Sequence, residues 1–129
     1  MILLDTSVLV DAFTGEQRSA PAIRGAIEDG ERIAVGAVVL YEWLRGPRTA
    51  REREAVEALF PAEQALPFGS AEAMLAARLY AGVARPRGRS MDIALAAHAI
   101  EQDAVIWTLN VKDFQDLPGV TAIVPPGRI

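Results

Sequence analysis

Short apolar runs alternate along the chain with longer segments in which apolar residues recur at helical spacing. The runs at residues 2–4 and 104–107 are uninterrupted, which is typical of strands buried on both faces of a parallel sheet. The pattern predicts strands at residues 2–4, 33–35, 65–68, 104–108 and 120–124; the third is weak, because Pro67 suits only an edge or a strand end. This alternation predicts one α/β domain over residues 1–129, a three-layer α/β/α sandwich with a mainly parallel central sheet.

The segments between the apolar runs carry start and stop signals for helices. Helices are expected at residues 8–13, 19–29, 38–45, 50–60, 71–84 and 91–100. The expected N-caps are Thr6 or Ser7, Thr49 with Glu52 as its capping-box partner, Ser70 and Ser90. Glycine or proline ends three of the helices, at Gly30, at Gly46 and at Pro61.

Four acidic residues far apart in the sequence come just after a strand or early in a helix: Asp5, Glu42, Asp92 and Asp113. The carboxyl ends of parallel strands meet at one edge of a sheet, so these side chains are expected to converge there. Three of these acids also have an ordinary structural interpretation. Asp5 could be a helix cap, Glu42 could pair with Arg45 or Arg48, and Asp92 could favour a helix dipole.

Carboxylates brought together repel one another unless a cation compensates. The chain has no cysteine and one histidine, so the available ligands are oxygens, which favour Mg²⁺ or Mn²⁺ over zinc. Such ions typically serve phosphate chemistry by activating a water and by carrying charge on a leaving oxygen. The one histidine, His98, is expected to be a half-exposed spacer in mid-helix.

Bulk composition narrows the class of protein. The hydrophobic content of 51% in 129 residues is enough for one cored domain, and the absence of cysteine is compatible with a reducing cytoplasm. No apolar run reaches the length of a membrane span, so a soluble, cytoplasmic protein is expected. The net charge of −4 argues against a general polyanion binder, although seven of the 13 basic residues lie within 45–53 and 85–89.

Four motifs in register carry a resemblance to a known family. They are Asp5-Thr6-Ser7-Val8-Leu9-Val10-Asp11, Glu42-Trp43-Leu44-Arg45-Gly46, Asp92-Ile93-Ala94-Leu95-Ala96-Ala97-His98-Ala99 and Thr108-Leu109-Asn110-Val111-Lys112-Asp113-Phe114. Together they resemble PIN-domain proteins and, more narrowly, the VapC toxins of bacterial type II toxin–antitoxin pairs. The resemblance implies a magnesium-dependent endoribonuclease, often a homodimer, that is inhibited by an antitoxin whose tail occupies the active-site groove.

The resemblance also implies roles for individual residues. Asp5, Glu42 and Asp92 match the first three acids of the family, and they would hold the metal together with a fourth. Many members place that fourth acid where this chain has Asn110, so Asp113 is expected to fill the role. The remaining implied roles are a supporting hydroxyl from Thr6 or Ser7, a structural role for Asp11, and contacts to the RNA backbone from Arg45, Arg48, Arg85, Arg87 and Arg89.

Two other functions fit parts of the pattern. Aspartate phosphatases and receiver domains also place an Asp after the first strand, but the phosphatase motif needs a second Asp where this chain has Ser7. A PIN-like module that only binds RNA or a protein partner is the non-enzymatic alternative. The RNA substrate cannot be read from the sequence, and a dimer surface is expected on the helices of residues 49–84.

Overall fold

The computed structural model describes residues 1–128 and contains a four-stranded sheet with six α-helices around it. The strands are β1 (Ile2–Leu4), β2 (Ile33–Ala34), β3 (Val105–Trp107) and β4 (Ala122–Ile123). The helices are α1 (Thr6–Phe13), α2 (Ala20–Glu28), α3 (Ala37–Arg45), α4 (Ala50–Leu59), α5 (Ser70–Gly82) and α6 (Ser90–Gln102), with 3₁₀ turns η1 (Ala62–Gln64) and η2 (Val111–Phe114).

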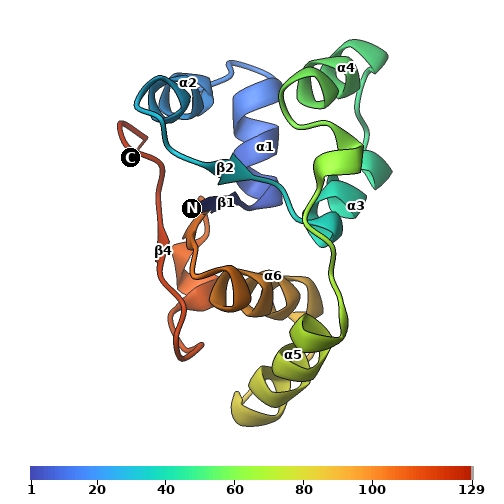
Figure 1. Cartoon of the computed structure of the whole chain (residues 1–129), viewed down its shortest axis with the longest axis vertical. Helices are drawn as coiled ribbons and strands as arrows, with labels where there is room; N and C mark the ends of the chain where they lie inside the picture. The colour runs from blue at the N-terminus through green and yellow to red at the C-terminus, as the bar shows by residue number, and fades with distance from the viewer. Residues whose placement is uncertain (129) are drawn as a thin grey trace.

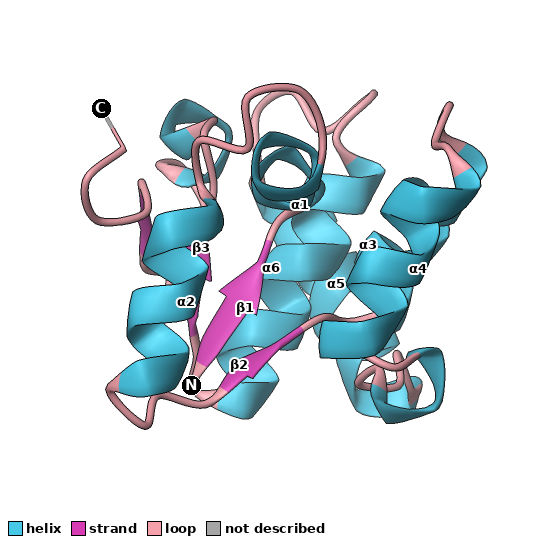
Figure 2. Cartoon of the chain, turned by 90° about the horizontal axis from the view of Figure 1, so that it is seen from above, coloured by secondary structure: helices cyan, strands magenta, loops and turns pink. Residues whose placement is uncertain are grey.

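All neighbouring strands are parallel, in the order β2-β1-β3-β4. The central strand β1 is fully apolar and buried, as its uninterrupted run predicts. Helices α1 and α2 lie on one side of the sheet and α6 on the other, which gives the predicted three layers (Figure 1). Figure 2 shows β1 leading at its carboxyl end directly into α1, while α6 passes beneath the strand. The α/β prediction is therefore confirmed.

The segment 65–68 is not a strand, contrary to the prediction. It forms a single bridge between Gly36 and Leu66, in which Leu66 N–H donates to Val35 and its carbonyl accepts from Ala37. Pro67 follows immediately and has no N–H with which to continue a ladder. The last two strands are also shorter than predicted, since pairing covers only Val105–Trp107 and Ala122–Ile123.

Three predicted helix caps differ in the structure. Asp5, and neither Thr6 nor Ser7, caps α1: its Oδ1 accepts from the Thr6 N–H at 2.8 Å. Ser70 and Ser90 are instead the first residues of α5 and α6. The capping box at the start of α4 is confirmed, because the Thr49 hydroxyl accepts from the Glu52 N–H and the Glu52 carboxylate accepts from the Thr49 N–H.

The core surrounds β1, β3 and the alanine-rich face of α6. His98 of α6 lies inside this core at 1% exposure, so the expectation of a half-exposed spacer is wrong. Its ring packs edge-on against Phe68 and so closely on Gly36 that a Cβ at Gly36 would come within 2.6 Å of the ring Nδ1. Burial lowers the pKa of His98, which favours the neutral ring. No helix within residues 1–128 is long and apolar enough to cross a membrane.

Candidate active site

Asp5 stands at the carboxyl end of β1 and is nearly buried. Its Oδ2 accepts from the Thr108 hydroxyl at 2.7 Å and from the Ser7 hydroxyl at 3.0 Å. These bonds join the first strand to the end of β3, where the parallel register brings Thr108 beside Asp5. Together with the bond from the Thr6 N–H, these bonds fix the orientation of the Asp5 carboxylate.

Glu42 reaches the same edge from α3. The Thr6 hydroxyl donates to its Oε1 at 2.8 Å, so the first turn of α1 bridges Asp5 and Glu42. Arg45 lies one turn further along α3, and its guanidinium is 3.8 Å from the other Glu42 oxygen. The pairing with Arg45 that the sequence left open therefore exists, although it is a long contact to a half-exposed side chain.

Asp92 lies in the first turn of α6, on the other side of the sheet edge. Burial, followed by the negative charges of Asp5, Asp113 and Glu42, raises the pKa of Asp92 from 3.8 to about 6. The other three predicted acids are thus close enough for their charges to act on Asp92. A raised pKa caused by like charges is typical of a functional cluster, because such repulsion is rarely tolerated without a use.

The four acids offer the oxygen ligands that ions such as Mg²⁺ prefer, but their side chains are not arranged as a preformed coordination shell. Within residues 1–128, no group of three Asp, Glu or His side chains is arranged to hold a metal ion. The Asp5 and Glu42 oxygens are engaged by hydroxyls, a backbone N–H and Arg45, and repulsion opposes a closer approach. Carboxylates and hydroxyls nevertheless suit Mg²⁺ or Mn²⁺, so the residues present fit such an ion chemically.

The chain is similar to known proteins in both sequence and fold. The sequence matches the PIN domain over residues 2–120. It is 36% identical over 125 residues to Ribonuclease VapC19 of Mycobacterium tuberculosis, which covers 92% of this chain and 95% of the relative. The chain belongs to the PIN-domain family and is of the VapC type.

Solved structures with this fold include VapBC2 from Rickettsia felis bound to a DNA fragment from their promoter. Its TM-score is 0.74 at 19% identity, covering 96% of this chain and 98% of the other. DNA-bound VapBC from Salmonella typhimurium has a TM-score of 0.77 at 21% identity, with 95% and 96% covered. A toxin–antitoxin complex from Klebsiella pneumoniae has a TM-score of 0.70 at 22% identity, with 97% and 98% covered. At these identities the likeness shows the fold.

Asn110 and Asp113, the two candidates for the fourth position of the acidic cluster, contribute to the site in different ways. The Asn110 N–H donates to the Thr108 hydroxyl at 2.9 Å, and its carbonyl accepts from the Asp113 N–H at 3.0 Å. Asp113 is exposed on η2, and its charge acts on Asp92. Asn110 thus contributes through its backbone, while Asp113 presents a carboxylate to the cluster.

The five arginines predicted to contact RNA differ in whether other residues of the protein hold their side chains. Arg48 stacks over the Trp43 ring at 4.5 Å, and its Nε donates to the Trp43 carbonyl at 3.2 Å. Arg89 is held by Asp116 and by the Asp113 carbonyl. The other three side chains are exposed, and they are Arg45, Arg85 and Arg87.

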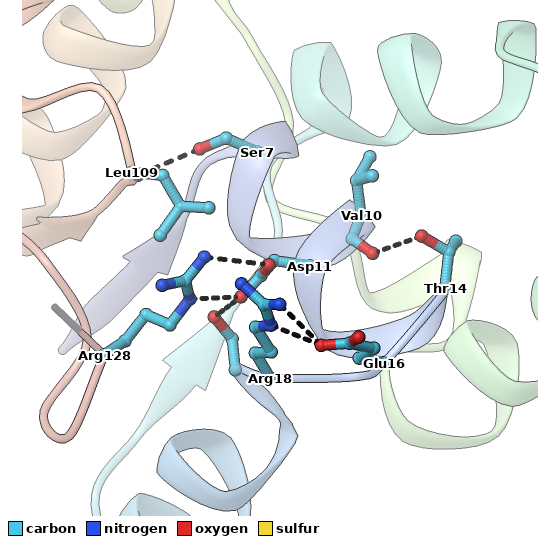
Figure 3. Close-up of polar contacts among 9 residues, drawn as sticks. Ser7, Val10, Asp11, Thr14, Glu16, Arg18, Leu109 and Arg128 are labelled. Carbon is cyan, nitrogen blue, oxygen red and sulfur yellow. Dashed lines mark hydrogen bonds and ion pairs between the residues drawn. The ribbon is translucent and has the colours of Figure 1, made fainter.

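Asp11 lies on α1, away from the acidic cluster. Figure 3 shows Arg128, near the end of the chain, pointing at Asp11, with its Nε 2.9 Å from Oδ2. The Ser19 hydroxyl donates to the same oxygen at 2.5 Å. The Arg128 bond lowers the pKa of Asp11, so the carboxylate stays charged. These contacts tie the C-terminal segment and the start of α2 to α1, which agrees with the structural role expected of Asp11.

Thr108 is the residue of this site that the sequence analysis missed. Its hydroxyl is fully buried, donates to Asp5 and accepts from Asn110, so it couples the ends of β1 and β3. The available signal was its position as the first polar residue after the apolar run of β3. With parallel strands in register, that position lies opposite the Asp that ends β1.

Proposed function

We propose that this PIN domain is a metal-dependent endoribonuclease that acts as the toxin of a type II toxin–antitoxin pair. The observation that carries the proposal is the convergence of three carboxylates from separate elements, those of Asp5, Glu42 and Asp113, on a fourth, Asp92. A cluster of like charges is costly unless a cation balances it, and hard divalent ions are used for phosphodiester hydrolysis. The name of the Mycobacterium tuberculosis relative, a ribonuclease, supports RNA as the substrate.

Each acid has a distinct task in this proposal. Asp5 and Asp92 would hold an Mg²⁺ or Mn²⁺ ion, with Glu42 and Asp113 completing its shell or orienting a water. When bound, the ion supplies an activated water and carries charge on the leaving oxygen. Asp5 enters this task already fixed by hydroxyl donors, which limits the reorganisation that binding requires. Thr6 fixes Glu42 in the same way.

Exposed arginines beside the cluster would hold the RNA backbone. Arg45 lies next to Glu42 on α3, and Arg85 and Arg87 lie on the loop before α6. Arginine suits this task because its planar fork matches phosphate oxygens. Arg48 and Arg89 are left out of this set because their guanidinium groups donate hydrogen bonds within the protein. The guanidinium of Arg45, by contrast, lies over the Tyr41 ring at 5.1 Å on an exposed side chain.

The partners follow from the same proposal. Solved structures with this fold include VapBC assemblies and a toxin–antitoxin complex, which supports a cognate antitoxin for this chain. A homodimer would use apolar side chains exposed on α4 and α5, namely Leu59, Met74 and Tyr80. The proposed setting is the cytoplasm, where RNA and antitoxin are both present.

The proposal is tested with protein purified free of any co-expressed partner. End-labelled total RNA is incubated with the wild type in Mg²⁺, in Mn²⁺ and in EDTA. Asp5→Asn and Asp92→Asn are assayed in parallel, since Asn retains the size of Asp and removes its charge. Asp103→Asn is the matched control: it makes the same change at the other end of α6, in an exposed left-handed position that Asn accepts well.

Cleavage is expected in both metals, with loss in EDTA and in both active-site variants, while Asp103→Asn cuts like the wild type. Removing a metal ligand is expected to cost a hundredfold or more in rate, on the order of the largest losses seen for neighbours of such ligands. Folded wild type that cuts no RNA in either metal would contradict the ribonuclease. RNA binding without cleavage would then favour the non-enzymatic module.

A further inference from the structure

The side chain of Arg89, at the start of α6, bridges two separate parts of the site. Its two terminal nitrogens donate to the two carboxylate oxygens of Asp116, at 2.8 and 2.6 Å. The nitrogen with the shorter bond also donates to the backbone carbonyl of Asp113, at 2.9 Å. Only the planar fork of arginine can make these bonds together, since a lysine has one terminal nitrogen.

The turn to which Arg89 donates this bond contains Asp113. This turn, η2, is a four-residue 3₁₀ segment, a class of helix with poor hydrogen-bond geometry that depends on outside contacts. Phe114, the last residue of this turn, and Leu117, three residues later, are buried in the core. Asp113 itself is exposed, and Arg89 donates side-chain hydrogen bonds to the Asp113 carbonyl and to Asp116, two residues after the turn.

Arg89 is also the N-cap residue of α6, and Asp92 lies in the first turn of the same helix. One residue therefore joins the helix end that carries Asp92 to the turn that carries Asp113. The charges of the two carboxylates repel each other, so we expect Asp113 to move away from Asp92 when this link is removed. Asp116 meanwhile holds the guanidinium of Arg89 through two hydrogen bonds.

We propose that Arg89 is a positioning residue that fixes the distance between Asp92 and Asp113, and that it acts through Asp116 and the Asp113 carbonyl. This inference rests on the proposed function, because the two acids must share one metal ion for their spacing to matter. It replaces the contact with RNA that the sequence suggested for Arg89.

The direction in which Mn²⁺ affinity changes on mutation of Arg89 distinguishes a positioning role from a purely electrostatic one. Removing a positive charge near four carboxylates would by itself favour binding of a cation. Arg89→Gln would then bind Mn²⁺ more tightly if only charge mattered. If Arg89 holds the acids at the right spacing, the same variant binds Mn²⁺ more weakly. Arg89→Lys keeps the charge and loses the fork, so any loss of affinity in it reports the fork alone.

The experiment measures Mn²⁺ affinity by isothermal titration for the wild type, Arg89→Gln and Arg89→Lys. Arg18→Gln is the control, because Arg18 also forms a close ion pair, with Glu16 at 2.6 Å, and is not part of the proposed site. Near-ultraviolet circular dichroism establishes that each variant is folded. RNA cleavage then gives kcat and KM at saturating metal.

Both Arg89 variants are expected to bind Mn²⁺ about tenfold more weakly, as is typical when a residue that orients metal ligands is lost. They should lower kcat more than they raise KM, while Arg18→Gln matches the wild type. Unchanged or tighter Mn²⁺ binding by Arg89→Gln, or normal binding by Arg89→Lys, would overturn the proposal. If Arg89→Gln does not fold, Arg89→Lys alone decides between these outcomes.

The design also separates this inference from the ribonuclease itself. A wild type that binds Mn²⁺ but cuts no RNA would contradict the nuclease, and the Mn²⁺ affinities would still test the role of Arg89. A wild type that cuts RNA, with Arg89 variants of normal Mn²⁺ affinity, would overturn the positioning role alone. A folded wild type without any Mn²⁺ affinity would overturn both.

Discussion

Replacing Asp92 by asparagine is expected to stabilise the metal-free protein at neutral pH. The pKa of Asp92 rises from 3.8 to about 6 on folding, chiefly through burial and then through the charges of Asp5, Asp113 and Glu42. At about 1.4 kcal/mol per pKa unit, the ionised carboxyl costs the fold about 3 kcal/mol. Asparagine avoids that cost but gives up a favourable interaction with the α6 dipole worth about 0.3–1 kcal/mol. A net gain of about 2 kcal/mol remains.

The pH dependence of this gain follows from the direction of the pKa change. The folded protein holds the Asp92 proton more tightly than the unfolded chain does, so this group stabilises the fold most below pH 3.8. That contribution is lost as the pH rises through about 6, and the free energy of unfolding falls with it. The advantage of Asp92→Asn is therefore expected at about pH 7.5 and absent at about pH 4.

Urea unfolding in EDTA at these two pH values measures the difference, with Asp103→Asn expected within about 0.5 kcal/mol of the wild type. In thermal unfolding, the gain corresponds to roughly 8 °C for a chain of this length. Millimolar Mg²⁺ should stabilise the wild type and not Asp92→Asn, which narrows the gap. Equal stabilities at about pH 7.5 in EDTA would refute the raised pKa of Asp92 on which this prediction rests.

Three further changes test contacts at the site and elsewhere in the fold. Thr108→Val removes the buried hydroxyl that bonds Asp5, so we expect a loss of about 1–3 kcal/mol in urea unfolding; an unchanged midpoint would contradict the bond. Gly36→Ala places a Cβ 2.6 Å from the His98 ring and should cost about 1–3 kcal/mol. Adding His98→Ala should then cost less than the two single changes summed, and strict additivity would count against the contact. Asp11→Asn loses an ion pair that lowers the pKa of Asp11, so its penalty of about 1 kcal/mol at neutral pH should shrink below about pH 4, as measured by acid titration of stability.

The parts of the fold that could be predicted are those set by local patterns. The uninterrupted apolar runs of β1 and β3 identify buried parallel strands, and the carboxyl-end rule then brings Asp5 and Asp113 to one edge. The capping box of α4 is local in the same sense, since Thr49 and Glu52 satisfy each other within one turn. Such features need no knowledge of what packs on them.

The parts that could not be predicted depend on partners distant in sequence. The burial of His98 follows from the approach of Gly36 and Phe68, which no periodicity on α6 reveals. Whether an arginine can bind RNA likewise depends on tertiary contacts. Arg48 stacks on Trp43, and Arg89 donates to the Asp113 carbonyl, 24 residues further along the chain. The sequence shows that these side chains are charged, but it does not show which residues lie beside them in the fold.

Asp5 caps α1 and joins the ends of β1 and β3 in addition to standing in the acidic cluster. Asp5 therefore has a structural role as well as a place in the acidic cluster. Under the proposed function, this combination determines which mutations would let a cell survive the toxin. Substitutions at Asp5 would remove activity and weaken the fold together, and they would leave little protein to engage an antitoxin. Substitutions at Asp92 would remove activity while relieving repulsion. Survivors selected for loss of toxicity, yet retaining abundant inactive protein, should therefore carry changes at Asp92 far more often than at Asp5.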